Sequence, residues 1–418
     1  MKKTAALIAA FALILCGCSE KNEQVNYPDS DAEWNELNIM ETENGYYIGG
    51  YTSNLFLRYH DRETENEIML CNKAECPHDG RETCTATYKN IACSNVVMYN
   101  NELYFFGSES DGENILVSLY RVSGDGSALD RINTVYSVKN NMDIKKIMFN
   151  NPVLLIHRGY AFLNIDLYSE STSFSGFLGG GYYKINLQNN EKTVLKNYDD
   201  FWGEKIEKTV PCGDYIFISG RKNSHVSYYK TGINSESIEP VTFDNDSLVI
   251  VSADAAKLYV KDTTEMNETE SVIIEFNPET MDKIREYKVK QGSETVYDGK
   301  LFVTGYETSD GTVKKQNVTV YEEGKEIFTT DNLPGDSETY SIISFSSGKI
   351  YIGNREEYSI NQLLISGKKY FSCNLEDFLS GNITWEEEYS TEETVTEWNK
   401  YLRSGGESGE MYYGFSSF

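Results

Sequence analysis

The sequence predicts an all-β protein, a β-propeller with seven blades; six or eight blades are the alternatives. Three observations predict this fold: a strand phrase recurs along the chain, the composition favours strands and tight turns, and helices that could connect parallel strands are not evident. Tyr, Phe and Gly number 31, 19 and 32, whereas Pro numbers only 7. This balance suits β-strands joined by short turns.

The recurring phrase marks one strand of each predicted blade. A turn containing Asn, Asp or Gly is followed by alternating aliphatic and aromatic residues. Successive copies begin 42 to 58 residues apart, which is close to the length of a propeller blade. The seven copies are 44–49, 100–107, 158–162, 212–218, 256–260, 298–303 and 348–353.

A second apolar strand follows most phrases after a polar loop, and its period-two alternation indicates one buried face. About four short strands per unit fit the available length. A pair of β-sandwich domains is the alternative, since it also gives short strands at regular spacing. The Gly-rich stretch Gly176–Gly181 is predicted to be a turn, and the strongest helical signals lie at Ser390–Leu402.

The net charge of −27 argues against nucleic-acid binding, because phosphate recognition needs stripes of Lys and Arg. Docking of a basic patch on anionic lipid is disfavoured for the same reason. With only four His residues, a His-rich catalytic centre is not expected.

The N-terminus predicts export and lipidation. A basic head, Met1-Lys2-Lys3, precedes the apolar run 4–15, which suits a signal peptide and is too short to span a membrane. Cys18 follows in a sequence that resembles a bacterial lipobox, so residues 1–17 are expected to be removed and Cys18 to carry acyl chains such as palmitate. The alternative is an ordinary secretory signal. The protein is thus expected at the cell membrane, facing outside the cytoplasm on the polar tether 18–40.

One Cys/His loop, residues 71–93, could carry chemistry. Cys71, Cys76, His78 and Cys84 have the pattern C-x4-C-x-H-x5-C, which would suffice for a structural zinc site. Disulfides Cys76–Cys84 and Cys71–Cys93 explain the thiols equally well in an exported protein. Either role would be structural, and no other cofactor is expected.

The chain resembles a group of uncharacterised bacterial surface lipoproteins with TolB-like or lipoprotein-receptor-like propellers. The resemblance rests on the lipobox, the acidic tether, the Cys/His loop and phrases such as Gly299-Lys300-Leu301-Phe302, and it covers most of the chain. It implies a propeller at 41–390 and a surface location, but no activity. Residues 391–418 are expected to form a tail with a short helix and a closing strand.

The function expected from these features is non-enzymatic binding of an extracellular peptide, glycan or partner protein by propeller loops. Trp34, Trp202 and Trp398 are the candidate contact residues, and no catalytic residue is assigned. The alternative is a carbohydrate-active hydrolase or lyase that uses carboxylates at the propeller mouth. No spacing of Asp and Glu singles out such a pair.

Overall fold

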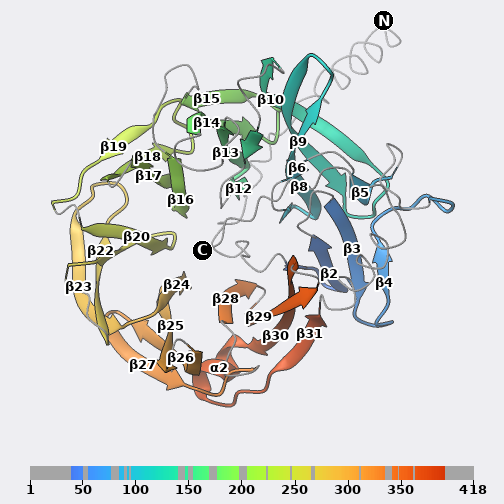
Figure 1. The fold of residues 1–418 in the computed structure, drawn as a ribbon. Helices are drawn as coiled ribbons and strands as arrows, with labels where there is room; N and C mark the ends of the chain where they lie inside the picture. The colour runs from blue at the N-terminus through green and yellow to red at the C-terminus, as the bar shows by residue number, and fades with distance from the viewer. Residues whose placement is uncertain are drawn as a thin grey trace, which may run out of the picture.

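Seven antiparallel sheets surround a common centre in the computed structural model of the chain (Figure 1). The structure describes residues 39–49, 55–76, 84–88, 92–93, 96–139, 146–148, 154–168, 177–196, 205–222, 225–244, 247–264, 269–309, 312–334, 341–346, 348–360 and 363–390. Within these residues the protein is a seven-bladed β-propeller, as predicted.

The first three blades each have one strand divided into two short pieces. Blade 1 contains β1 (Ile39–Glu41), β2 (Gly45–Gly49), β3 (Leu55–Asp61), β4 (Glu67–Met69) and β5 (Thr87–Tyr88). Blade 2 contains β6 (Ala92–Cys93), β7 (Val97–Tyr99), β8 (Glu102–Ser110), β9 (Asn114–Ser123) and β10 (Leu129–Lys139). Blade 3 contains β11 (Lys146–Met148), β12 (Leu154–His157), β13 (Tyr160–Tyr168), β14 (Phe177–Asn186) and β15 (Lys192–Lys196).

The other four blades are regular four-stranded sheets. Blade 4 contains β16 (Lys205–Cys212), β17 (Tyr215–Lys222), β18 (His225–Gly232) and β19 (Glu239–Val241). Blade 5 contains β20 (Leu248–Ala253), β21 (Leu258–Asp262), β22 (Glu270–Phe276) and β23 (Lys283–Lys290). Blade 6 contains β24 (Ser293–Tyr297), β25 (Lys300–Ser309), β26 (Thr312–Glu322) and β27 (Lys325–Thr330). Blade 7 contains β28 (Ser341–Ser346), β29 (Lys349–Ile360), β30 (Leu363–Asn374) and β31 (Glu386–Ser390).

Each recurring phrase contributes the second strand of a blade, and the apolar strand after it is the third. These two strands pair in the middle of each sheet, so both of their faces are covered by neighbouring blades. The tight turn before the second strand uses residues that tolerate a left-handed backbone, as in Asp298-Gly299, with φ of 49° and 70°.

Among the described residues, apolar clusters fill six of the junctions between neighbouring blades. Leu103 and Phe105 of blade 2 pack with Leu57 of blade 1, for example, and the other clusters join blades 2 and 3, 3 and 4, 4 and 5, 5 and 6, and 6 and 7. The blades therefore bury their apolar faces against one another, which one sheet alone could not do.

Two sequence expectations differ from the fold. Gly179, Gly180 and Gly181 lie inside β14, where they pair with β13 and do not form the predicted turn. A short helix that was not predicted, α2 (Leu375–Ser380), connects β30 to β31. Its N-cap is Asn374, whose side chain accepts hydrogen bonds from Glu376 N and Asp377 N, which satisfies backbone donors of the first turn. The helix expected at Ser390–Leu402 and the closing strand expected within 391–418 fall outside the described residues, apart from Ser390, which ends β31.

Among the described helical residues, none forms a segment that is long and apolar enough to cross a membrane.

Candidate functional site

The Cys/His loop brings three of its predicted residues together. The sulfur atoms of Cys71, Cys76 and Cys84, here called the thiol cluster, lie within 4.8 Å of one another. Cys84 is buried, and the other two are half-buried. His78 and the side chain of Cys93 lie outside the described residues, as do Cys18, Trp34, Trp202 and Trp398.

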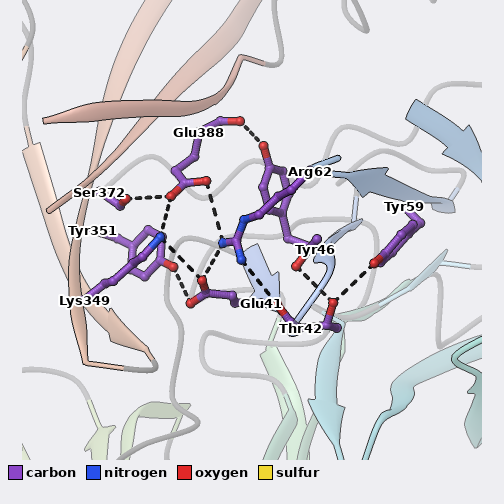
Figure 2. Close-up of polar contacts among 10 residues, drawn as sticks. Glu41, Thr42, Tyr46, Tyr59, Arg62, Lys349, Tyr351, Ser372 and Glu388 are labelled. Atoms are coloured by element: carbon purple, nitrogen blue, oxygen red, sulfur yellow. Dashed lines mark hydrogen bonds and ion pairs between the residues drawn. The ribbon is translucent and has the colours of Figure 1, made fainter. Parts of the chain in front are cut away.

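A second polar group joins the two ends of the ring (Figure 2). We call it the closing network, and it comprises Glu41, Tyr46 and Arg62 of blade 1 with Lys349, Tyr351, Ser372 and Glu388 of blade 7. The Tyr351 hydroxyl donates to Glu41, and Arg62 donates to the same carboxylate. The Tyr46 hydroxyl donates to the Glu388 backbone oxygen. These contacts hold the first blade against the last.

Both carboxylates of the closing network are neutralised by the same two cations. Lys349 Nζ lies 2.9 Å from Glu388 Oε1 and 3.7 Å from Glu41 Oε1, and Arg62 Nη2 lies 3.7 Å from Glu388 Oε2. Burial alone would raise the pKa of Glu388, but hydrogen bonds from Ser372 and Lys349, with the two positive charges, hold this pKa below its usual range. Such fully paired acids stabilise a junction, and they are poorly placed to transfer protons.

A third polar group lies between blades 3 and 4, and we call it the blade 3–4 polar cluster. It contains Asn164, Asp166 and Tyr168 of β13, Tyr182 of β14, and Lys205 and Thr209 of β16. Alternate residues of a strand share a face. Phe162, at the start of this alternation, packs with Ile206 of blade 4, so the three β13 members share the face toward that blade. The strand β16 is among those nearest the centre of the ring (Figure 1).

The blade 3–4 polar cluster holds one buried carboxylate oxygen whose hydrogen-bonding capacity is not used. Asp166 Oδ2 is buried and has no hydrogen-bond partner among the described residues, whereas the Tyr182 and Thr209 hydroxyls lie close enough to hydrogen-bond with each other. Native proteins rarely leave such atoms unpaired, because each costs about 1–3 kcal/mol. The unpartnered Asp166 oxygen therefore indicates a place that a water or ligand completes.

The Asp166 carboxyl is the most perturbed acid of this cluster. It is fully buried, and its other oxygen, Oδ1, accepts a long hydrogen bond of 3.4 Å from Asn164 Nδ2. Burial raises its pKa to about 7, although Lys205 and Asn164 oppose this shift. Burial and the Asp166 charge in turn raise the pKa of Tyr168.

Glycine makes the room for Asp166. Gly180 stands directly opposite Asp166 in the pairing of β13 with β14, so no side chain of β14 covers the carboxyl at that position. A Cβ at Gly180 would lie 2.8 Å from Ile165 O and 2.9 Å from Asp166 Oδ1, which is too close for a real side chain.

Sequence reasoning missed Asp166, although a signal was present. The β13 sequence YAFLNIDLY is apolar except for Asn164 and Asp166, and polar residues two apart in a buried strand indicate a shared polar face. The arrangement can exchange a proton near neutral pH beside a phenol and an ammonium group.

No protein-family model matches the sequence, and no curated protein does. Solved structures do resemble it. A post-proline cleaving enzyme from Rickettsia typhi matches with a TM-score of 0.52 at 8% identity, over 87% of this chain and 53% of the enzyme. A prolyl endopeptidase, one of two studied for inter-domain dynamics, matches with a TM-score of 0.49 at 9% identity. The match covers 84% of this chain and 49% of the endopeptidase. TolB from Acinetobacter baumannii matches with a TM-score of 0.34 at 10% identity, over 81% of this chain and 76% of TolB.

These similarities show a shared β-propeller fold. This chain spans about half the length of the two post-proline enzymes. The structures that share the fold are mostly peptidases. This finding contradicts the predicted non-enzymatic binding function. At 8–11% identity the comparisons assign no reaction, so the reaction has to be argued from this chain's own residues.

Proposed function

We propose that the chain is a carbohydrate-active enzyme, a hydrolase or a lyase, in which Asp166 gives or takes the proton. One observation carries the proposal: the carboxyl is buried beside the inner strand β16, with Oδ2 unpartnered and a pKa of about 7. A proton-transfer group is most effective when its pKa lies near the working pH. Carboxyls with raised pKa serve as acids in glycoside cleavage.

The neighbours of Asp166 support this role. Lys205 is close enough to lower the carboxyl's pKa, and its positive charge would stabilise an anion that forms during elimination. Tyr168 lies two residues along β13 on the same face, and its hydroxyl is a second proton-transfer group beside the Asp166 carboxyl. Hydrolysis would need a further carboxylate besides Asp166, because glycosidases use two, whereas elimination needs one base.

The experiment compares full-length wild type with Asp166→Asn on xylan, mannan, polygalacturonate and hyaluronan. Reducing ends report cleavage by either reaction, and ultraviolet absorbance of an unsaturated product reports elimination. We expect wild-type turnover of at least one polymer and a loss of 10²- to 10⁴-fold in the variant. Asp214→Asn is the matched control, since this Asp lies in blade 4 with its side chain 68% exposed. An inactive wild type, or a fully active Asp166→Asn, would overturn the proposal.

We also propose that the enzyme works outside the cytoplasm, held to the membrane by acyl chains on Cys18. The basic head, the apolar run 4–15 and the position of Cys18 support this placement. Two or three acyl chains are enough to anchor a globular body. Cys18→Ala should move the protein out of the membrane fraction and remove the lipid mass from its N-terminal peptide. Recovery of unprocessed wild type with Met1 from the cytosol would contradict the placement.

A further inference from the structure

The thiol cluster occupies an interruption in the outer strand of blade 1. Both β4 and β5 pair with β3, β4 on Arg58–His60 and β5 on Leu55–Phe56. Cys71 follows β4 by two residues, and Cys84 precedes β5 by three. The chain thus leaves the edge of the sheet after β4 and returns to this edge at β5. Cys71 lies where the chain leaves, and Cys84 lies where the chain returns.

Contacts with blade 2 fix the two ends of this excursion. The buried Thr85 hydroxyl lies 2.7 Å from Gly126 O and 3.1 Å from Leu70 O. Gly126 has a φ of +68°, and a Cβ there would lie 2.6 Å from Leu70 C and 2.9 Å from Cys71 N. The turn of blade 2 therefore presses directly against the segment that presents Cys71, so the position of this thiol is set by packing.

A local turn supplies the third thiol. Cys76 N donates to Lys73 O at 3.0 Å, which returns the chain toward Cys71. Cys84 belongs to the apolar cluster between blades 1 and 2, and Cys71 and Cys76 pack against it. Three sulfurs from separate points of the chain thus converge at the border of an apolar region.

We propose that Cys71, Cys76 and Cys84 bind one zinc ion as thiolates. Zinc–sulfur bonds of about 2.3 Å in a tetrahedron separate the sulfurs by about 3.8 Å, and the observed limit of 4.8 Å is close to this spacing. A disulfide between two of these sulfurs would leave the third to pair outside the cluster, as in the expected Cys71–Cys93 bridge, whereas one zinc ion uses all three sulfurs that converge here. Soft thiolate ligands select zinc over magnesium or calcium. His78, the fourth ligand expected from the sequence, is not part of this assignment because it lies outside the described residues.

Zinc binding would release the thiol protons and tie the excursion to the junction of blades 1 and 2. The role is structural, and it is independent of Asp166, which belongs to the junction of blades 3 and 4.

The test measures metal directly. Full-length protein prepared under reducing conditions without chelator should contain about one zinc per chain. Cobalt substitution should give the intense sulfur-to-cobalt charge-transfer absorbance of thiolate ligands. Cys71→Ser and Cys76→Ser, at half-buried positions, should each lower zinc content at least tenfold while circular dichroism keeps its β-sheet spectrum. Cys212→Ser and Cys373→Ser are the controls, because these buried cysteines lie in blades 4 and 7, and they should keep the zinc.

Three results would overturn the proposal. They are a Cys76–Cys84 disulfide found by mass spectrometry in protein isolated without reductant, zinc content below a tenth of an ion per chain after zinc is supplied, and zinc binding that survives Cys71→Ser and Cys76→Ser. None of these bears on Asp166→Asn, so the zinc site and the proposed enzyme can fail separately.

Discussion

The Tyr351 hydroxyl of blade 7 donates a hydrogen bond to the Glu41 carboxylate of blade 1, across 310 positions of sequence. In the described residues, each blade is built from consecutive strands, and no strand of blade 1 pairs with a strand of blade 7. Side chains of the described residues therefore link blade 1 to blade 7, and this link depends on charge.

Glu388→Gln should weaken this junction. We expect the free energy of unfolding to fall by about 2 kcal/mol at pH 7, less than for a fully buried pair because the two cations are partly exposed. The pKa of Glu388 is held below its usual range, so the carboxylate stabilises the fold above about pH 4.5 and loses this effect as the pH falls further. Urea unfolding of wild type and variant at pH 7 measures the loss of stability, and the same comparison at pH 3.5 measures its pH dependence.

Glu387→Gln is the control for this change, because Glu387 is the exposed neighbour on the same strand. Its effect should stay within about 0.5 kcal/mol. Equal losses in the two variants would show that Glu388 does not hold the ring closed.

Asp166→Asn should stabilise the protein in alkaline solution. The folded-state pKa of about 7 lies above the ordinary value of 3.8, so the folded state binds the proton more tightly than the unfolded chain. Stability therefore falls as the pH rises from about 4 to 7, by up to about 4 kcal/mol in the limit. Denaturant titrations should show little difference between variant and wild type at pH 4, and a gain of at least about 1 kcal/mol, a quarter of that limit, at pH 8.5. Destabilisation at both pH values would contradict the assigned burial.

Gly180→Ala should destabilise blade 3. The new methyl group would meet Ile165 O and Asp166 Oδ1 at less than 3.0 Å, and we expect a cost of about 1–3 kcal/mol from the forced backbone shift. Gly232→Ala is the matched control, since Gly232 lies in the third strand of the next blade and its nearest contact would be 3.7 Å. Thermal unfolding of both variants tests this, and equal melting temperatures would argue against the close approach.

The blade architecture could be predicted because its signal is local and repeated. Phrases such as Asp298-Gly299-Lys300-Leu301 combine a left-handed turn with a buried strand, and both features depend on residues adjacent in sequence. The closure of the ring could not be predicted this way. Glu388 stands in the run Glu386-Glu387-Glu388, which reads as a solvated strand edge, yet only Glu386 and Glu387 are exposed.

One of the two candidate sites could likewise be predicted from the sequence, and the other could not. Cys71, Cys76 and Cys84 are recognisable because cysteines are few and these lie close in sequence. Asp166 is one of 65 acidic residues, and its special environment arises from Gly180 and Lys205, which lie on other strands. Only the tertiary packing of blades 3 and 4 distinguishes it from the solvated majority.

When the first and last blades of a propeller are linked by side chains, the ring can gain or lose one whole blade at a time. Within the described residues every blade is built from strands that are consecutive along the chain, so duplication or deletion of a blade-length coding segment would leave the remaining hydrogen-bond ladders intact. In a propeller closed by an exchanged strand, the same event at the seam would orphan a strand. This architecture therefore makes the number of blades readily variable by recombination, so long as the terminal units keep the complementary charges that join them.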